Sequence, residues 1–205
     1  TIAMTTQVRT PAPSSGRIAE KFAAVRKIAG IRPLVVGPGM KTGLNIALDN
    51  PATMGSDLVV GAAAALAIHD PPLIIIDMGT ATTMTVIDRE ARVLGGAIIP
   101  GVGISLEALA NGTSQLPHIS LDAPKKCIST DTVEAMRSGS VYGTAAMLDG
   151  MIERMEAELG EPAAVIATGG LGGCIIPYCR REITYDKNLL LNGLWALYQK
   201  NKRKR

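Results

Sequence analysis

The sequence predicts an α/β fold in which helices pack against a mixed β-sheet. Three apolar or β-branched segments follow residue 72 with only short turns between them, which is the pattern of adjacent antiparallel strands. A long helical pattern and another apolar strand come next, as a crossover connection requires. Apolar residues make up 47% of the chain and aromatic residues 3%, so we expect a large, aliphatic core.

The first 70 residues hold the shorter elements. Thr, Ser and Pro dominate residues 1–16 and predict an irregular lead-in. Apolar spacing and turn residues then predict a helix, a short strand, a glycine-rich loop and a small-residue helix, at residues 17–29, 34–36, 37–43 and 56–69. Gly30 is well placed to end the first helix, and Ser56 or Asp57 to cap the second.

The segment 70–72, Asp-Pro-Pro, is the clearest break in the chain, and the pattern changes after it. The strands expected beyond it cover residues 73–77, 81–88, 93–99, 164–167 and 183–185. The helices expected beyond it cover residues 105–111, 132–159 and 189–198. Three antiparallel strands followed by alternating helices and strands form the ribonuclease H-like arrangement of acetate kinases, sugar kinases and heat-shock ATPases. We therefore expect two such domains, an incomplete one over 1–70 and a second over 71–205.

The segment from Asp77 to Thr83 is the most informative part of the chain. A buried strand delivers Asp77, whose carboxylate is a hard ligand for a cation that balances phosphate charge. Gly79 allows backbone N–H groups to approach a phosphate closely. The hydroxyl groups that can donate to phosphate oxygens belong to Thr80, Thr82 and Thr83. A hairpin whose polar groups serve only the turn is the alternative, but a second strand end at Gly169-Gly170 favours the phosphate site.

Eight segments, in matching order and spacing, resemble the type III pantothenate kinases between about Leu34 and Asn201. They are residues 37–43, 49–51, 55–57, 77–83, 95–101, 113–117, 132–139 and 167–170. The resemblance implies a kinase that transfers phosphate from ATP to the primary hydroxyl of pantothenate, the first step of coenzyme A synthesis. It also implies magnesium, a monovalent cation such as potassium or ammonium, and a homodimer with active sites near the subunit interface.

The resemblance also implies roles for individual residues. Asp57 corresponds to the general base that accepts the hydroxyl proton, and capping of the following helix is the alternative use of an Asp there. Asp77 corresponds to the ligand of the monovalent cation. The positions implied in ATP binding are Gly79, Thr80, Thr82, Gly169 and Gly170. The positions implied in pantothenate binding are Gly55, Ser56, Asp57, Leu58 and Thr132. Thr132 also has a capping alternative, since it opens a long helix.

The chain departs from the family pattern where the acceptor is expected. Leu58 stands where the family often has an Arg that can pair with the pantothenate carboxylate, and Leu48 where it often has Tyr. Either another group such as Lys41 holds the carboxylate, or the acceptor differs. The family also opens with a strand and an Asp-x-Gly-Asn-Thr loop that residues 1–30 do not resemble. We expect the sequence to be part of a longer protein; loss of half the ATP site is the alternative.

The remaining features concern location and partners. Three cysteines without CxxC spacing fit a reducing cytoplasm and do not predict a zinc site. No apolar run approaches the roughly 18 residues of a membrane span, and the net charge of +3 does not predict a nucleic-acid partner. Two alternatives to the kinase stay open. One is a non-catalytic regulatory relative that senses nucleotide or pantothenate, and the other is a nucleic-acid binder that uses the basic tail, residues 200–205.

Overall fold

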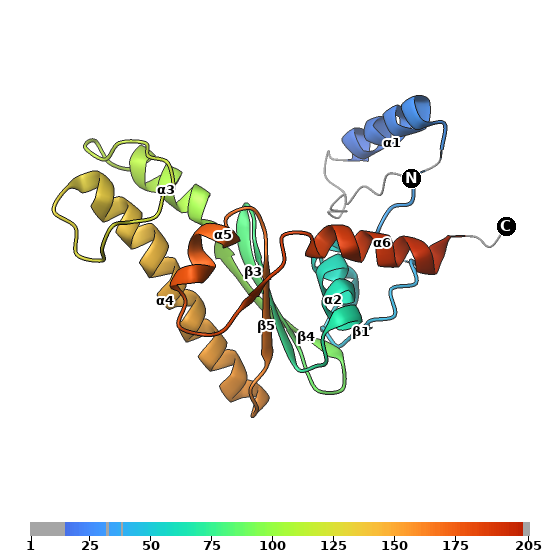
Figure 1. Cartoon of the computed structure of the whole chain (residues 1–205). Coiled ribbons are helices and arrows are strands. Elements are labelled where there is room, and N and C mark those ends of the chain that lie inside the picture. Colours follow the sequence, from blue (N-terminus) through green and yellow to red (C-terminus); the bar gives the residue numbers. More distant parts are fainter. Residues whose placement is uncertain (1–14, 32, 38, 203–205) are drawn as a thin grey trace.

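The structure, a computed structural model, describes residues 15–31, 33–37 and 39–202 (Figure 1), so most of the expected irregular lead-in lies outside the described residues. The strands are β1 (Asn45–Ile46), β2 (Leu73–Met78), β3 (Ala81–Ile87), β4 (Arg92–Pro100), β5 (Ala164–Thr168) and β6 (Thr184–Tyr185). The helices are α1 (Ser15–Ala29), α2 (Ser56–Ile68), α3 (Val102–Asn111), α4 (Thr132–Leu159), α5 (Gly172–Ile175) and α6 (Leu189–Asn201). Two 3-10 turns cover Pro51–Thr53 and Ile176–Tyr178.

The strands form one mixed sheet in the order β1-β4-β3-β2-β5-β6. β2, β3 and β4 are antiparallel neighbours, whereas β5 runs parallel to β2 and β6 runs parallel to β5. The predicted α/β, ribonuclease H-like class is confirmed by this order, with its antiparallel trio followed by crossover strands. Because β2, β5 and β6 point the same way, their carboxyl ends lie at the same edge of the sheet.

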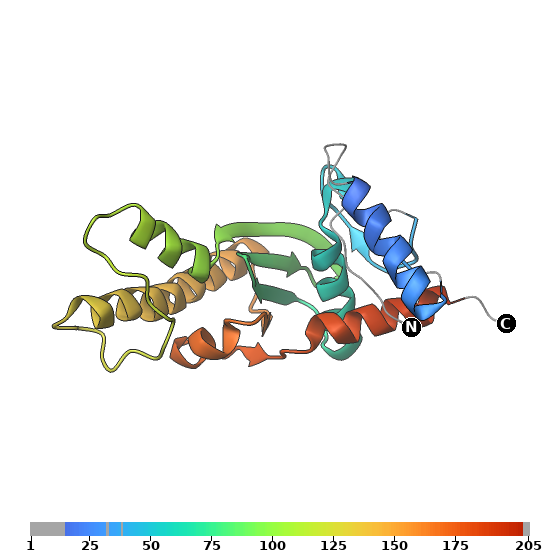
Figure 2. The same ribbon diagram turned by 90° about the horizontal axis from the view of Figure 1, so that it is seen from above.

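Helices lie on both faces of the sheet (Figure 1 and Figure 2), and the side chains of β2 alternate between these two layers. Ile74 and Ile76 point into one buried cluster, together with residues of α3 and α4. Leu73 and Ile75 point the other way and join a second cluster with α2. Because successive side chains of a strand face opposite sides, Asp77 projects onto the α2 face. The alternation of side chains along β2 therefore determines that Asp77 faces the layer that contains α2.

Two helices, α2 and α6, cross closely over this second face. A side chain at Gly193 of α6 would overlap the carbonyl oxygen of Val60 and would lie 2.8 Å from its Cγ1 atom. Glycine at this position therefore allows α6 to press α2 against the sheet. Since only four residues join α2 to β2, the two elements run in opposite directions. The first turn of α2 consequently lies toward the carboxyl end of β2.

Most elements expected from the sequence are confirmed, with ends that differ by a few residues. The expected strand over 34–36 is wrong, because only Val35 forms an isolated bridge there. β1, α5 and the two 3-10 turns were not expected, since elements of two to four residues are too short to show a period. The division into two domains at residue 70 stays a prediction; β1 and α2 pack with elements beyond that point.

The first helix, α1, is separated from both helical layers in Figure 1. Its residues Phe22 and Val25 are half-buried, and Ile28 is 85% exposed. Within the described ranges, no helix combines the length and the hydrophobicity that a membrane crossing requires.

Candidate functional site

Two carboxylates from different elements meet at the carboxyl edge of the sheet. Asp77 is the fifth residue of β2, and Asp57 is the second residue of α2. The pKa of Asp77 is raised above its usual value, first by burial and then by the negative charge of Asp57. A like charge has this effect at short range. The fold therefore brings these two candidate residues into one site.

Hydroxyl groups flank Asp77 on both sides. Thr83 of β3 and Thr168 of β5 lie directly opposite it in the two neighbouring strands. Residues that lie opposite one another project from the same face of a sheet, so all three side chains share the α2 face. Thr168 is only 2% exposed, whereas Asp77 and Thr83 are half-buried. Asp77 is thus the centre of a short row of side-chain oxygens across three strands.

The start of α2 determines where the Asp57 carboxylate lies. The N-cap of the helix is Gly55, so the expectation that Ser56 or Asp57 would cap it is wrong. The Oδ1 atom of Asp57 accepts a hydrogen bond of 3.0 Å from the backbone N–H of Leu58. A side chain at Gly55 would overlap the same oxygen atom. Gly55 therefore leaves room for the carboxylate at the helix start, where the helix dipole favours a negative charge.

The other two expected neighbours of Asp57 lie in the same first turn. Ser56 is 7% exposed, and Leu58 is half-buried. Leu58 thus presents an apolar surface next to the Asp57 carboxylate. The resemblance had led us to expect a basic group at position 58.

The turn between β2 and β3 presents Gly79 and Thr80 at the surface. A Cβ atom at Gly79 would come no closer than 3.7 Å to the surrounding atoms, so packing within the chain does not require glycine there. By contrast, a Cβ atom at Gly101 would lie 2.6 Å from the carbonyl oxygen of Gly79. Gly101 precedes α3 and lets the start of that helix support the turn. Gly101 ends the segment 95–101, for which the sequence predicted no separate role.

Thr82 differs from the other threonines of this segment. In the β2–β3 register it lies opposite Met78, whose side chain belongs to the cluster on the α3–α4 face. It is 1% exposed. The structure therefore places Thr82 on the α3–α4 face of the sheet, whereas Asp57 and Asp77 lie on the α2 face. Thr82 is not part of the site that these two carboxylates form.

The loop after β5 packs against the end of β2. Gly169 has a φ angle of +99°, a conformation that residues with side chains disfavour. A Cβ atom there would lie 2.5 Å from the carbonyl oxygen of Met78. Gly170 is exposed and has open space where a side chain would be. Because these two residues have no side chains, the backbone of the loop can pack directly against β2, the strand that carries Asp77.

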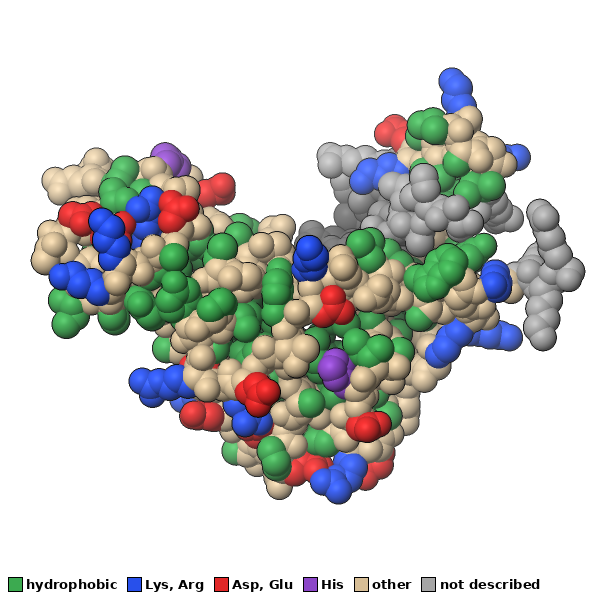
Figure 3. Space-filling view, viewed as in Figure 1, with side chains coloured by type: hydrophobic (Ala, Val, Ile, Leu, Met, Phe, Trp, Pro, Cys, Tyr) green, Lys and Arg blue, Asp and Glu red, His purple; other side chains and the backbone are tan. Residues whose placement is uncertain are grey.

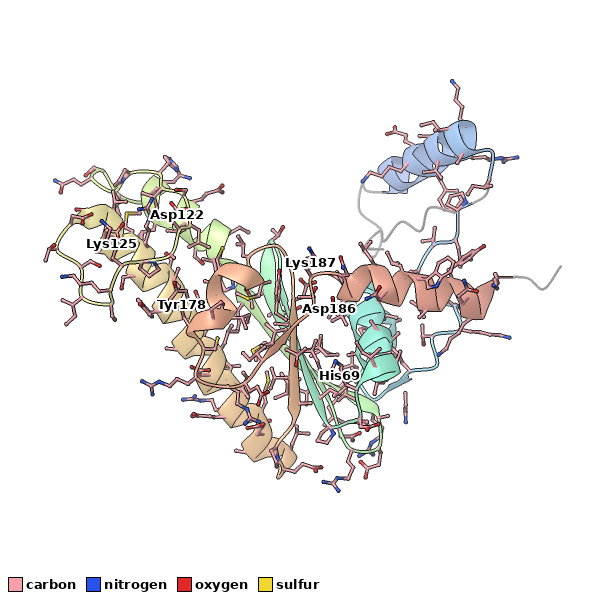
Figure 4. All side chains as sticks on the ribbon, viewed as in Figure 1. His69, Asp122, Lys125, Tyr178, Asp186 and Lys187 are labelled. Atoms are coloured by element: carbon pink, nitrogen blue, oxygen red, sulfur yellow. The ribbon has the colours of Figure 1, made fainter. Side chains whose placement is uncertain are left out.

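Thr132 lies away from this edge. It is exposed at the start of α4, beside the loop that holds Asp122 and Lys125, on the far side of the sheet from α2 (Figure 4). The cap of α4 is Asp131, whose side chain accepts a hydrogen bond from the backbone N–H of Glu134. Both expected roles of Thr132 are therefore unmet within one chain: it neither caps the helix nor approaches Asp57.

Lys41 is tied to the end of α6. Its backbone N–H donates to Asn201 Oδ1 at 3.0 Å, and Asn201 Nδ2 donates to the carbonyl oxygen of Lys41 at 2.9 Å. Its side chain is exposed. A helix of 13 residues is about 20 Å long, so Lys41 lies at the end of α6 that is remote from the β6–α6 junction.

The sheet edge offers hard oxygen ligands for a cation. Two carboxylates with neighbouring hydroxyl groups suit an ion that keeps water or phosphate oxygens in its coordination shell, as Mg²⁺ does. In the part of the chain that the structure describes, no group of three or more His, Cys, Asp or Glu could enclose a metal ion. A cation at this edge would therefore need ligands from a bound molecule as well.

A cavity of about 510 Å³ lies at the opposite end of the sheet, between the β3–β4 turn and the end of α4. Its charged residues pair with one another: Arg89 with Glu161, and Arg92 with Asp88. No predicted site residue lines it, and we assign it no role.

Large apolar side chains are exposed on several elements of the described chain. Leu94 and Ile98 of β4 and Ile104 and Leu109 of α3 are among them. Others lie on α6, where Figure 3 shows apolar side chains along the helix; Leu191 is 65% and Trp195 61% exposed. Such patches are common where another protein surface binds.

Comparisons with known sequences identify relatives for most of the chain. A family model described as type III pantothenate kinase matches residues 14–154. A type III pantothenate kinase from an Exiguobacterium species is 47% identical over 173 residues, which cover 84% of this chain and 68% of the relative. A type III pantothenate kinase from Halalkalibacterium halodurans is 42% identical over 176 residues, which cover 86% of this chain and 69% of the relative.

Among solved structures, a conserved protein of Campylobacter jejuni described as a Baf family transcriptional activator has a similar fold. The two structures superpose with a TM-score of 0.61 at 21% identity, covering 90% of this chain and 78% of the other. At this level of identity the likeness concerns the fold alone.

Proposed function

The chain belongs to the type III pantothenate kinase family, and we propose that it uses ATP to phosphorylate pantothenate to 4'-phosphopantothenate, the first step of coenzyme A biosynthesis. The observation that carries the proposal is the proximity of Asp57 and Asp77 at the sheet edge that also bears the Gly79–Thr80 turn and the Gly169–Gly170 loop. Segments far apart in the sequence thus converge where a phosphate, a cation and an acceptor hydroxyl would have to meet.

In the proposed reaction, the primary hydroxyl oxygen of pantothenate attacks the γ-phosphorus of ATP. The new P–O bond forms while the bond to the β–γ bridging oxygen breaks, and ADP leaves with that electron pair. Asp57 takes the hydroxyl proton as general base. The hydrogen bond from the Leu58 N–H supports this role, because it fixes the direction of the carboxylate.

The nucleotide phosphates are proposed to bind at the β2–β3 turn, with Thr80 donating its hydroxyl group and the 169–170 loop lying alongside. Gly79 supports this placement, since packing within the chain does not explain a glycine there but close approach of a ligand does. Magnesium would supply charge neutralisation at the phosphates, and a potassium or ammonium ion would bind at Asp77. A cation would offset both causes of the raised pKa of Asp77, burial and the charge of Asp57.

The acceptor is proposed to lie at the start of α2, against Gly55, Ser56 and Leu58. Thr132 cannot join it within one subunit, because α4 begins on the far side of the sheet (Figure 4). A homodimer in which the start of α4 approaches the site of the other subunit would reconcile the two observations. The exposed apolar side chains Ile104 and Leu109 of α3 support such an assembly. We propose the cytoplasm as its location, since the three cysteines are free.

The test is phosphoryl transfer by the purified full-length protein with ATP, magnesium, potassium and pantothenate. ADP formation that depends on pantothenate, together with a product of the mass of 4'-phosphopantothenate, is the expected result. Leu58 favours one other outcome, because it stands at the position where a basic group for the acceptor carboxylate was expected. Saturable binding of nucleotide or pantothenate without turnover would instead indicate a non-catalytic regulatory protein.

A further inference from the structure

Tyr185, the last residue of β6, contacts the loop that follows β5 in two ways. Its hydroxyl group donates a hydrogen bond of 2.8 Å to the carbonyl oxygen of Gly169. Its ring fills the space beside Gly172, where an added Cβ atom would overlap the ring. A Cβ atom at Gly173 would also contact the ring, at 3.7 Å. One side chain therefore contacts both ends of the Gly169–Gly173 segment.

The same segment is fixed from its other side by β2. Gly169 lies so close to the backbone of Met78 that a Cβ atom would come within 2.6 Å of its N, C and O atoms. Met78 is the residue between Asp77 and the Gly79 turn. The loop is thus held between the end of β2 and the ring of Tyr185, and any shift of the loop changes its position relative to the proposed phosphate site.

The position of Tyr185 in the sheet explains why it can reach the loop. Its partner in the parallel β5–β6 register is Ala167, whose side chain lies on the α3–α4 face. Tyr185 therefore projects to the face that carries α5, away from Asp57 and Asp77. It is 37% exposed, more than a residue that serves only the core would be.

We propose that Tyr185 is a positioning residue for nucleotide binding: it holds the Gly169–Gly173 loop against β2 in the conformation that accepts ATP. This inference rests on the proposed function and adds a residue that itself touches neither phosphate nor acceptor. The loop supplies exposed backbone at Gly170, and Tyr185 limits the conformations that this backbone adopts before ATP arrives.

The test compares Tyr185→Phe with Tyr178→Phe in the full chain. Tyr178, labelled in Figure 4, is half-buried in the core beside α4 and serves as the matched control. Loss of one neutral hydrogen bond in the loop is expected to raise the KM for ATP about five-fold. The KM for pantothenate and kcat should stay within about two-fold in both variants. A rise of both KM values together, or no rise for ATP, overturns the proposal.

Amide hydrogen exchange separates failure of this proposal from failure of the kinase assignment. Without nucleotide, the amides of residues 170–173 are expected to exchange about five-fold faster in Tyr185→Phe than in the unmodified chain. Unchanged exchange there refutes the positioning role even if the protein is a kinase. An unmodified full-length protein that does not turn over refutes the kinase, and the exchange rates still decide whether Tyr185 orders the loop.

A pair of substitutions tests the packing contact independently. Gly172→Ala alone should raise the KM for ATP at least as much as Tyr185→Phe, because the new methyl group displaces the ring. In a Tyr185→Val background the methyl group has room, and Gly172→Ala should add less than two-fold. Additive effects of the two changes would show that the ring does not act through Gly172.

Discussion

Replacement of Asp57 by Asn tests the proposed chemistry most directly. The change removes one negative charge and keeps Oδ1, which accepts the hydrogen bond from the Leu58 N–H. The start of α2 should therefore survive, while the group that would take the hydroxyl proton is lost. A general base contributes roughly 10²–10⁴ in rate, so we expect kcat to fall by that factor. The KM for ATP should change little, because Asp57 is not proposed to contact the nucleotide.

The assay is pantothenate-dependent ADP release, measured beside thermal unfolding of the same preparations. Asp70→Asn is the matched control, since it removes the same charge from an exposed residue just beyond the other end of α2. Its kcat should stay within about two-fold of the original. The reasoning is refuted if Asp57→Asn keeps more than a tenth of the original kcat. It is also refuted if Asp57→Asn loses activity only in proportion to lost folded protein.

Three further predictions follow from the same geometry. Asp77→Asn should abolish turnover yet raise the unfolding temperature of the ligand-free protein at pH 7. The pKa of Asp77 is raised by burial and by Asp57, so its favourable contribution to folding is present below its unfolded pKa and is lost as the pH rises through the folded value. Thermal unfolding at pH 3 and pH 7 checks this, and a gain of the same size at both pH values would contradict it. Thr80→Ala should raise the KM for ATP several-fold, whereas Thr82→Val should leave it unchanged, as steady-state kinetics would show. Gly193→Ala should destabilise the chain by about 1–3 kcal/mol, since its methyl group overlaps Val60. An unchanged midpoint of urea unfolding would show that α2 and α6 can move apart without loss of stability.

The sequence predicts the sheet well, because the strands around the site are long enough to show their pattern. The order of β2, β3 and β4, the long α4 and the strand that ends in Gly169-Gly170 all follow from apolar spacing and turn residues. The position of Asp77 at the end of a buried strand is readable in the same way. The elements that were missed span two to four residues, over which no period can be recognised.

The direction of each threonine could not be predicted, because it depends on strand register. A shift of one residue in the pairing of β2 with β3 would exchange the faces of Thr82 and Thr83. The observed register sets Thr83 opposite Asp77 and turns Thr82 into the opposite layer. The spacing of threonines in the sequence carries no information about this choice, which the turn geometry and the packing of both faces determine together.

Contacts between distant segments were equally inaccessible to sequence reasoning. Tyr185 lies 16 residues from Gly169 and belongs to a strand of two residues, so no local pattern links them. Thr132 shows the converse. Its motif suggested a place near Asp57, but α4 begins on the far side of the sheet from α2 (Figure 4). A motif can indicate that a residue serves a site without indicating which subunit supplies it.

The charges around Asp77 add a second argument for the proposed binding site. Some other carboxylates of the described chain have basic partners: Arg137, for example, binds both Glu134 and Asp122. Across the described residues, no Lys or Arg forms an ion pair with Asp77, although burial and Asp57 both disfavour its charged form. A purely structural position would be more stable with a neutral side chain. The proposed cation would make this arrangement favourable, and a nucleotide would bring phosphate oxygens to complete the coordination of that cation. The two negative charges therefore destabilise the ligand-free fold, and the same two charges would attract the proposed cation.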